Sequence, residues 1–107
     1  MRFNEDQLAQ IELGRVAGLT EKQLSIFARP SYNDRQMEKI RWAIQNGVDI
    51  DKVYEYCNSS YSAEDLEILL WAFQDELTDS QIQEIINTGD SDWYITYERI
   101  TSKDKNK

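Results

Sequence analysis

Residues 32–60 read YNDRQMEKIRWAIQNGVDIDKVYEYCNSS, and this stretch decides the fold because copies of its pattern flank it on both sides. Positions 29 residues apart carry side chains of matched size and polarity in six columns. The columns are Phe3, Tyr32 and Tyr61; Leu8, Met37 and Leu66; Ile11, Ile40 and Leu69; Gly14, Ala43 and Ala72; Leu19, Val48 and Leu77; and Leu24, Val53 and Ile82. A fixed period of this length is typical of units that bury their apolar faces by stacking on copies of themselves.

Each copy carries the signals of a long helix followed by a short one. Side chains that cap helix N-termini precede the predicted helices, and Gly18 and Gly47 stand where the first two long helices end. The cap residues are Asn4, Thr20, Asn33, Asp49, Ser62 and Thr78, and the predicted helices are about 5–17, 21–28, Asn33 to Gly47, Asp49 to Cys57, Ser62 to Gln74, and Thr78 to before Gly89. Within each long helix, apolar residues recur at the i, i+3, i+7 spacing of a core stripe, and the short helices carry i, i+3 pairs. The predicted core residues are Leu8 and Ile11; Met37, Ile40 and Ile44; Leu66, Leu69 and Phe73; Leu24 and Phe27; Val53 and Tyr56; and Ile82 and Ile85. The sequence therefore predicts an all-α fold of three tandem helical hairpins (3–31, 32–60 and 61–89), stacked as a short right-handed α–α solenoid.

The repeat decays after residue 89, and residues 90–100 are open to two interpretations. Apolar side chains at helical spacing follow a cap, Ser91 or Asp92, but the alternating and β-branched character also suits an extended segment. We favour a short helix, because a lone strand would leave its backbone groups without partners. This aromatic C-terminal cap would cover the end of the stack with Trp93, Tyr94 and Tyr97. Residues 1–100 then form one domain, and 101–107 form a polar tail that is expected to be disordered.

The net charge of −8 is distributed unevenly along the chain. Residues 1–52 balance eight acids with eight bases, whereas residues 53–98 hold eleven acids and neither lysine nor arginine. The remaining residues, 99–107, are net positive. A negative potential over 53–98 would repel nucleic-acid phosphates and attract basic protein surfaces. The same acids would also serve solubility alone, and the sequence does not separate these two alternatives.

The composition favours a cytoplasmic protein without a membrane segment. The chain has no run of about 18 apolar residues, and its start turns acidic at Glu5 and Asp6, so neither a transmembrane helix nor a signal peptide is expected. Cys57 is the only cysteine, which excludes an internal disulfide and fits a reducing compartment. It shares a column with Ala28 and Ile86, so we expect a small core side chain rather than a nucleophile.

The sequence offers little for catalysis or metal binding. There is no histidine to act as a general base or a zinc ligand, and the four glycines form no phosphate-binding loop. The carboxylates within 64–67 and 75–79 are dense enough for an acid–base pair or a divalent metal, but acids also gather at helix starts because of the helix dipole. We therefore expect no enzymatic activity, no cofactor and no bound metal.

Trp42 and Trp71 share a column with Leu13, two positions after the Ile40 column. This offset is about 200° around a helix, so the column leaves the main core stripe. Exposed on one face of a stack, such tryptophans would form a binding hot spot. Alternatively, stacked copies would cover both sides of the long helix, and the column would be buried between copies. The leucine at position 13 of this column favours the second alternative.

A further pattern crosses the junction of the first two copies, consisting of Phe27-Ala28-Arg29-Pro30, Tyr32, Gln36-Met37-Glu38-Lys39-Ile40-Arg41 and Gly47-Val48-Asp49. It resembles a repeat from mobile-element and phage proteins of Gram-positive bacteria. The resemblance covers residues 3–89, and the third copy departs from it with Glu76 at the glycine position and no proline after Ile86. It implies a helical-repeat fold and a mobile-element setting, and it brings no catalytic residues.

These features favour a non-enzymatic interaction protein whose acidic half binds a basic groove of a nucleic-acid-processing protein, such as a nuclease. It would then act as an anti-CRISPR or anti-restriction protein does. The carboxylates expected to make this contact are Glu64, Asp65, Glu67, Asp75, Glu76, Asp79 and Glu84. One alternative is a protein–protein scaffold that uses the Trp42 and Trp71 face. Another is weak nucleic-acid binding through Arg15, Lys22, Arg29, Arg35, Lys39 and Arg41, against which the net charge argues.

Overall fold

The computed structural model describes residues 2–89 and 92–105, and every regular element within them is a helix. The seven helices are α1 (Glu5–Val16), α2 (Glu21–Phe27), α3 (Asp34–Gln45), α4 (Ile50–Tyr56), α5 (Ala63–Gln74), α6 (Asp79–Ile86) and α7 (Trp93–Lys105). Long and short helices alternate from α1 to α6, so the predicted all-α class is confirmed. None of the helices in the described part of the chain is long and apolar enough to cross a bilayer.

Side chains cap the helices at the predicted positions. The side chains of four cap residues accept a hydrogen bond from the backbone N–H three residues later, and their own backbone N–H groups donate to the side-chain oxygen of the glutamine there. These residues are Asn4, Thr20, Asn33 and Thr78. The reciprocal pair satisfies two backbone donors that a helix start leaves free. Ser62 and Asp49 cap α5 and α4 through their own side-chain oxygens.

The three long helices of the repeat end in the same way. Gly18 and Gly47 have φ angles of 87° and 88°, and Glu76 at the equivalent place has a φ of 59°. The residue after each turn donates its N–H to a carbonyl five residues back, from Leu19 to Gly14, Val48 to Ala43 and Leu77 to Ala72. A left-handed residue suits glycine, which has no Cβ. The third copy therefore holds a glutamate in a backbone conformation that favours glycine.

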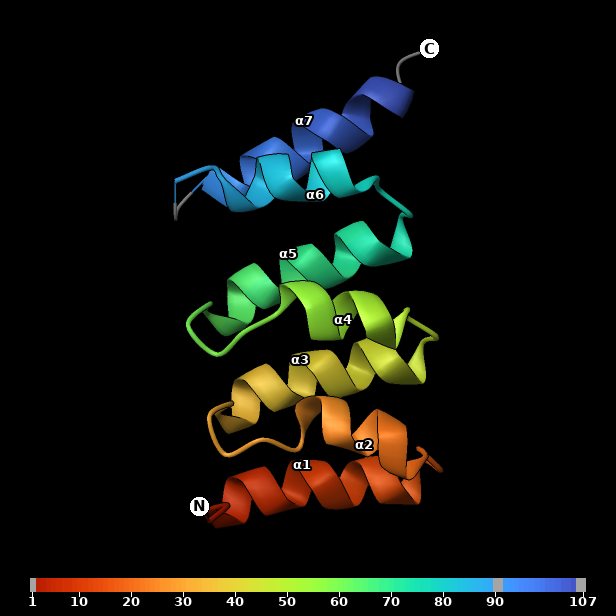
Figure 1. Cartoon of the computed structure of the whole chain (residues 1–107), viewed down its shortest axis with the longest axis vertical. Helices are drawn as coiled ribbons and strands as arrows, with labels where there is room; N and C mark the ends of the chain where they lie inside the picture. Colours follow the sequence, from red (N-terminus) through yellow and green to blue (C-terminus); the bar gives the residue numbers. More distant parts are fainter. Residues whose placement is uncertain (1, 90–91, 106–107) are drawn as a thin grey trace.

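The helices follow one another along the longest axis of a molecule measuring 45 × 26 × 18 Å (Figure 1). Each long helix contacts the next, in the pairs α1 and α3, α3 and α5, and α5 and α7. The short helices pack beside them, with contacts of α2 to α1, α3 and α4, and of α6 to α5 and α7. As a result, residues 29 apart on neighbouring long helices come to lie on adjacent levels.

The predicted core is buried, with one exception. The buried members are Ile11, Leu24, Phe27, Met37, Ile40, Ile44, Val53, Tyr56, Leu66, Leu69, Phe73, Ile82 and Ile85. Leu8 is 51% exposed, although Met37 and Leu66 in the same column are fully buried. The prediction for Leu8 is wrong because α1 contacts a long helix on one side only, whereas α3 lies between two.

A buried glutamine ties each of the first two copies to the loop that leads into the next copy. The side-chain amides of Gln7 and Gln36 each donate to two backbone carbonyls, those of Pro30 and Tyr32 and those of Ser59 and Tyr61, at 2.6–3.1 Å. The sequence predicts Gln36 only as part of a cap. These bonds satisfy loop carbonyls that burial would otherwise leave without partners. The third copy has Asp65 at this position, whose side chain has no such amide.

The C-terminal segment is helical, so the extended alternative is wrong. Helix α7 continues to Lys105, beyond the predicted end near residue 100, and the possible cap Ser91 lies outside the described residues. Thr101 sits within this helix with its hydroxyl bonded to the carbonyl of Tyr97, so a polar sequence does not end the helix there. Trp93 is 3% exposed and packs against Tyr61, with 4.9 Å between the ring centroids.

Candidate protein-interaction face

The two tryptophans of the repeat column lie at the surface, one on α3 and the other on α5. Trp42 is 45% exposed and Trp71 is 37% exposed, and Leu13 in the same column of α1 is 47% exposed. Inter-repeat packing would have buried them as it buries Met37 and Leu66. The column therefore runs along the outer side of the long helices. Of the two alternatives for this column, an exposed face and inter-repeat packing, the structure has the exposed face.

Two tyrosines of α7 extend this surface beyond Trp71. The ring centroids of Tyr94 and Tyr97 lie 6.5 and 5.8 Å from that of Trp71, and 6.4 Å from each other. We call these three side chains the aromatic triangle, and together with Trp42 they form the aromatic face. The sequence predicts Tyr94 and Tyr97 only as cover for the end of the stack, yet Tyr94 is 48% exposed.

The period of the repeat could not have identified these tyrosines. The residue 29 positions after Trp71 is Ile100, which extrapolation of the column would place at the surface. Ile100 is instead 7% exposed, and Tyr97 contacts Trp71 in its place. Helix α7 therefore packs in another rotational setting, which its decayed sequence does not specify. The abundance of aromatic residues after Asp92 was the only available signal.

Each tyrosine of the aromatic triangle donates its hydroxyl hydrogen to a carboxylate. Tyr97 bonds to Asp75, and Tyr94 bonds to Glu98 at 3.1 Å. Burial is the main cause that raises the pKa of Tyr97, and the hydrogen bond to Asp75 is the second. The hydrogen bond to Glu98 is the main cause that raises the pKa of Tyr94. Both tyrosines therefore stay neutral near pH 7 and hold a carboxylate at the rim of the aromatic face.

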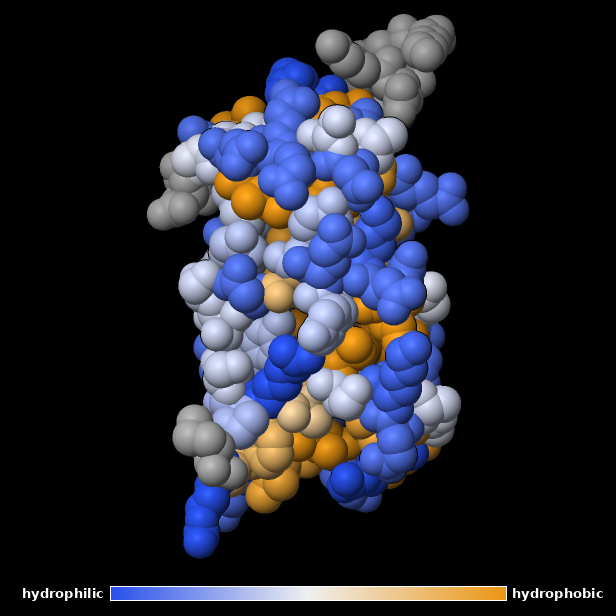
Figure 2. Space-filling model, viewed as in Figure 1, coloured by the Kyte–Doolittle hydropathy of each residue, from blue (hydrophilic) through white to orange (hydrophobic). Residues whose placement is uncertain are grey.

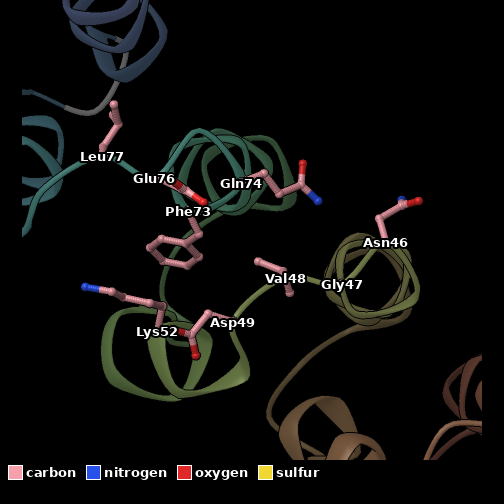
Figure 3. A pocket seen from close by; sticks show the side chains of 9 residues that line it. All are labelled: Asn46, Gly47, Val48, Asp49, Lys52, Phe73, Gln74, Glu76 and Leu77. Atoms are coloured by element: carbon pink, nitrogen blue, oxygen red, sulfur yellow. The ribbon is translucent and has the colours of Figure 1, made fainter.

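A narrow groove of about 150 Å³ separates Trp42 from Trp71. A wider hollow of about 550 Å³ lies beside it, over the C-terminal ends of α3 and α5, and Asn46 and Gln74 line both. Figure 3 shows that one side of the hollow comes from the α3–α4 turn and the start of α4, and the other from the end of α5 and its turn. The remaining lining residues are Gly47, Val48, Asp49, Lys52, Phe73, Glu76 and Leu77.

Hydrophobic surface also occurs elsewhere. Figure 2 shows hydrophobic side chains at several levels along the long axis, each bordered by hydrophilic ones. The other large exposed hydrophobic residues are Leu8, Val16, Tyr54 and Ile95. Isolated apolar side chains are normal on a protein surface, whereas adjoining aromatic rings are the informative feature.

Four of the seven acids predicted to bind a partner form ion pairs with the protein's own bases. The pairs are Glu64 with Arg35 at 2.6 Å, Glu67 with Lys39 at 3.2 Å, Asp79 with Lys52 at 2.6 Å, and Glu84 with Arg99. The first three bases come from the second copy, because stacking places residues about one period apart side by side. The separation of charge along the sequence is therefore partly cancelled in space.

Two of these acids have a lowered pKa. A bond from its own backbone N–H, followed by the pair with Arg35, lowers the pKa of Glu64. Bonds from Lys52 and from the Tyr56 hydroxyl lower the pKa of Asp79. Both carboxylates stay ionised at neutral pH, and a basic side chain of the same molecule compensates the charge of each.

The other three predicted acids lie at the ends of α5. The backbone N–H of Asp65, near the start of α5, donates a hydrogen bond to the Ser62 hydroxyl oxygen. Asp75 accepts from Tyr97, and Glu76 follows in the left-handed turn. Neither Asp75 nor Glu76 takes part in an ion pair among the described side chains. The seven acids are thus spread over α5 and α6 rather than gathered in one patch.

Among the described residues, no three acidic or cysteine side chains are grouped so that they could hold a metal ion. Cys57 is 9% exposed, and burial raises the pKa of its thiol to about 12. The thiol is therefore protonated at neutral pH and packs in the core, as the sequence predicts.

Comparisons of this chain with protein-family models, with curated proteins and with solved structures find no match. The resemblance to mobile-element repeats stays a prediction from the sequence.

Proposed function

We propose that this chain is a non-enzymatic interaction protein that binds a protein partner through the aromatic face. In this proposal the three copies form a short α–α solenoid of stacked hairpins, closed at its end by α7 with Trp93 as the buried aromatic residue of the cap. We place its action in the bacterial cytoplasm, where a single cysteine stays reduced.

The exposure of Trp42 and Trp71 carries the proposal. A tryptophan at the surface leaves a large apolar area in water, which burial against a partner would remove at about 25 cal/mol per Å². Tryptophan and tyrosine are also the residues most enriched at the centres of protein interfaces. Two such residues at equivalent positions of neighbouring copies, with two tyrosines beside Trp71, form an extended surface rather than a single exposed side chain.

The long helices give this surface a rigid support. Trp42 projects from the last turns of α3 and Trp71 from those of α5, and the two helices pack directly on each other. Lys39 and Arg41 lie over the Trp42 ring and help to fix it. A rigid platform loses little side-chain entropy on binding, which favours affinity.

A second candidate function is inhibition of a nucleic-acid-processing protein by the acidic half, in the manner of an anti-CRISPR or anti-restriction protein. The net charge of −8 favours it, as do Asp75 and Glu76, which form no ion pair among the side chains that the structure describes. It ranks second because four of its seven acids already have internal partners. Reversing Asp75 and Glu76 to lysine should abolish such inhibition, whereas unchanged inhibition would exclude it.

The third hypothesis, nucleic-acid binding through the first half, has the least support. Arg35 and Lys39 pair with acids of the third copy, and Arg41 is buried with hydrogen bonds to Gln10 and Gln45. Phosphates would have to compete with these internal partners.

Affinity capture from a Gram-positive lysate with matched variants tests the proposed function. The double variant Trp42→Ala/Trp71→Ala should lose a protein that the unchanged chain retains. Tyr54→Ala should retain it, because Tyr54 is 68% exposed on α4 and does not belong to the aromatic face. Equal retention by all three proteins, with helical content unchanged, would contradict the proposal.

A further inference from the structure

The aromatic triangle has a geometry suited to a cation. The three centroid separations of Trp71, Tyr94 and Tyr97 lie between 5.8 and 6.5 Å, so the rings stand at the corners of a triangle rather than in a row. Trp71 and Tyr94 are open to solvent, at 37% and 48% exposure. The faces of aromatic rings carry negative charge density that attracts ammonium and guanidinium groups.

The described lysine and arginine side chains lie over other rings and leave this cluster open. The intramolecular pairs are Lys39 and Arg41 with Trp42, Arg29 with Tyr54, and Lys52 with Tyr56, at 5.3–5.9 Å from the ring centroids. Among the side chains that the structure describes, no lysine or arginine lies over a ring of the aromatic triangle. Within the part of the chain that the structure describes, the three rings of this surface cluster therefore have no internal cation.

Carboxylates at the rim add a second attraction for positive charge. Asp75 accepts the hydroxyl of Tyr97, and Glu98 accepts that of Tyr94, so each carboxylate is held at the outer end of a ring. Neither acid forms an ion pair among the described residues. Ring faces and free carboxylate oxygens together favour a group that is both flat and positively charged.

We infer that the aromatic triangle receives an arginine side chain from a basic segment of the protein partner. This inference rests on the proposed function and assigns the chemistry of its partner. A guanidinium group stacks on an aromatic ring and donates hydrogen bonds to carboxylates at the same time. The groove between Trp42 and Trp71 lies next to the triangle and accepts the neighbouring part of the segment. A second copy of this chain is a poorer occupant, because two chains of net charge −8 repel each other.

The test is a titration with a short synthetic peptide of alternating arginine and serine, followed through the three indole N–H resonances in a ¹H–¹⁵N spectrum. Single Trp→Phe variants assign the resonances. The Trp71 signal should move on addition of the peptide, and the Trp93 signal should stay, because Trp93 is buried and donates to the Thr88 carbonyl. A peptide with citrulline in place of arginine has nearly the same shape without the charge, and it should leave Trp71 unmoved.

Variants of Tyr94 supply the matched control. Tyr94→Ala should weaken binding of the arginine peptide about threefold to tenfold, the loss expected for one cation–aromatic contact. Tyr94→Phe keeps the ring and removes the bond to Glu98, so it should keep most of the affinity. Because Tyr94 is about half exposed, both variants should fold, as judged by an unchanged Trp93 resonance.

Equal binding of the citrulline and arginine peptides, or unchanged affinity in Tyr94→Ala, would overturn the inference. A dimer of the unchanged chain that Tyr94→Ala dissociates in sedimentation would also overturn it, because the occupant would then be a second copy. Failure of the peptide alone leaves the proposed function standing as long as lysate capture still depends on Trp42 and Trp71. Loss of that dependence removes the proposed function itself.

Discussion

Helices α1 and α5 occupy equivalent places in the first and third copies, yet they present different surfaces. On the side that turns toward the preceding helix, α5 buries Leu70 and Phe73, whereas α1 has the exposed pair Glu12 and Arg15 at the same positions. On the outer side, α1 carries only Leu13, whereas α5 carries Trp71 within an aromatic cluster.

The difference separates two kinds of position in the repeat. The caps, the left-handed stops and the columns of Ile11 and Gly14 have equivalent roles in both helices, and they determine how the chain folds. The positions that differ between the two helices are of two kinds. Some contact a neighbouring helix in α5 and solvent in α1, and others lie on the outer face of both helices. We therefore look for function where the copies differ, and Trp71 is the largest such difference on an exposed face.

The greatest difference in stability is expected between two residues of the same column, Leu66 and Leu8. Leu66→Ala should lower the free energy of unfolding by about 2–5 kcal/mol, because it leaves a cavity in a fully buried site. Leu8→Ala removes the same atoms from a side chain that is 51% exposed, and it should cost less than about 1 kcal/mol. Urea unfolding followed by circular dichroism measures both. Similar losses for the two variants would mean that Leu8 is covered in solution.

The buried glutamine of α1 should give the next largest effect. Gln7→Ala leaves the carbonyls of Pro30 and Tyr32 without their donor, which should cost about 1–3 kcal/mol of unfolding free energy. Gln23→Ala removes a glutamine that forms only an exposed cap, and it should cost less than about 1 kcal/mol. If the two variants are equally stable, the tie between copies has no net stabilising effect.

The turn after α5 offers a change that should stabilise the protein. Glu76→Gly places glycine at a φ of 59°, where a side chain is strained, and should raise the free energy of unfolding by about 1 kcal/mol. Gly18→Ala introduces the same strain after α1 and should lower it by a similar amount. Thermal unfolding distinguishes the two directions, and a lower midpoint for Glu76→Gly would indicate that the carboxylate stabilises the fold.

The smallest expected effect is on the loss of stability at acidic pH, through the ion pair of Asp79 and Lys52. The lowered pKa of Asp79 means that its stabilising contribution is present above the ordinary carboxyl range and is lost as the pH falls through the folded-state pKa. Lys52→Met removes the main cause of that shift, so stability should fall less steeply below about pH 4 than in the unchanged chain. Lys22→Met, at an exposed lysine of α2, is the control. Identical acid profiles for both variants would mean that the exposed pair contributes nothing, as many surface pairs do.

Much of the fold was predictable from the sequence because caps, stops and apolar columns are local or periodic signals. The helices from α1 to α6 begin at their predicted caps, and the left-handed turns fall at Gly18, Gly47 and Glu76. The exposure of Leu8 was not predictable from its column, because a column records similarity and does not say which copy lacks a neighbour. The length of α7 was missed because its last residues are polar.

The candidate site was less predictable. The Trp42 and Trp71 column was visible, but its exposure depended on how closely α3 and α5 pack. The aromatic triangle depended on the rotational setting of α7, for which the repeat gives no information once its pattern decays. The ion pairs of Glu64 and Asp79 arise from side-by-side placement of residues that a linear charge count treats as separate.

The solvent accessibility of the three indole groups in the unchanged protein tests directly whether the aromatic face is exposed. A soluble paramagnetic agent broadens NMR signals near the surface, and each tryptophan has one indole N–H resonance. We expect strong broadening for Trp42 and Trp71, which are 45% and 37% exposed, and little for Trp93, which is 3% exposed. Equal and weak broadening of all three signals would show that the tryptophan column is packed between copies, and it would contradict the aromatic face as a binding surface.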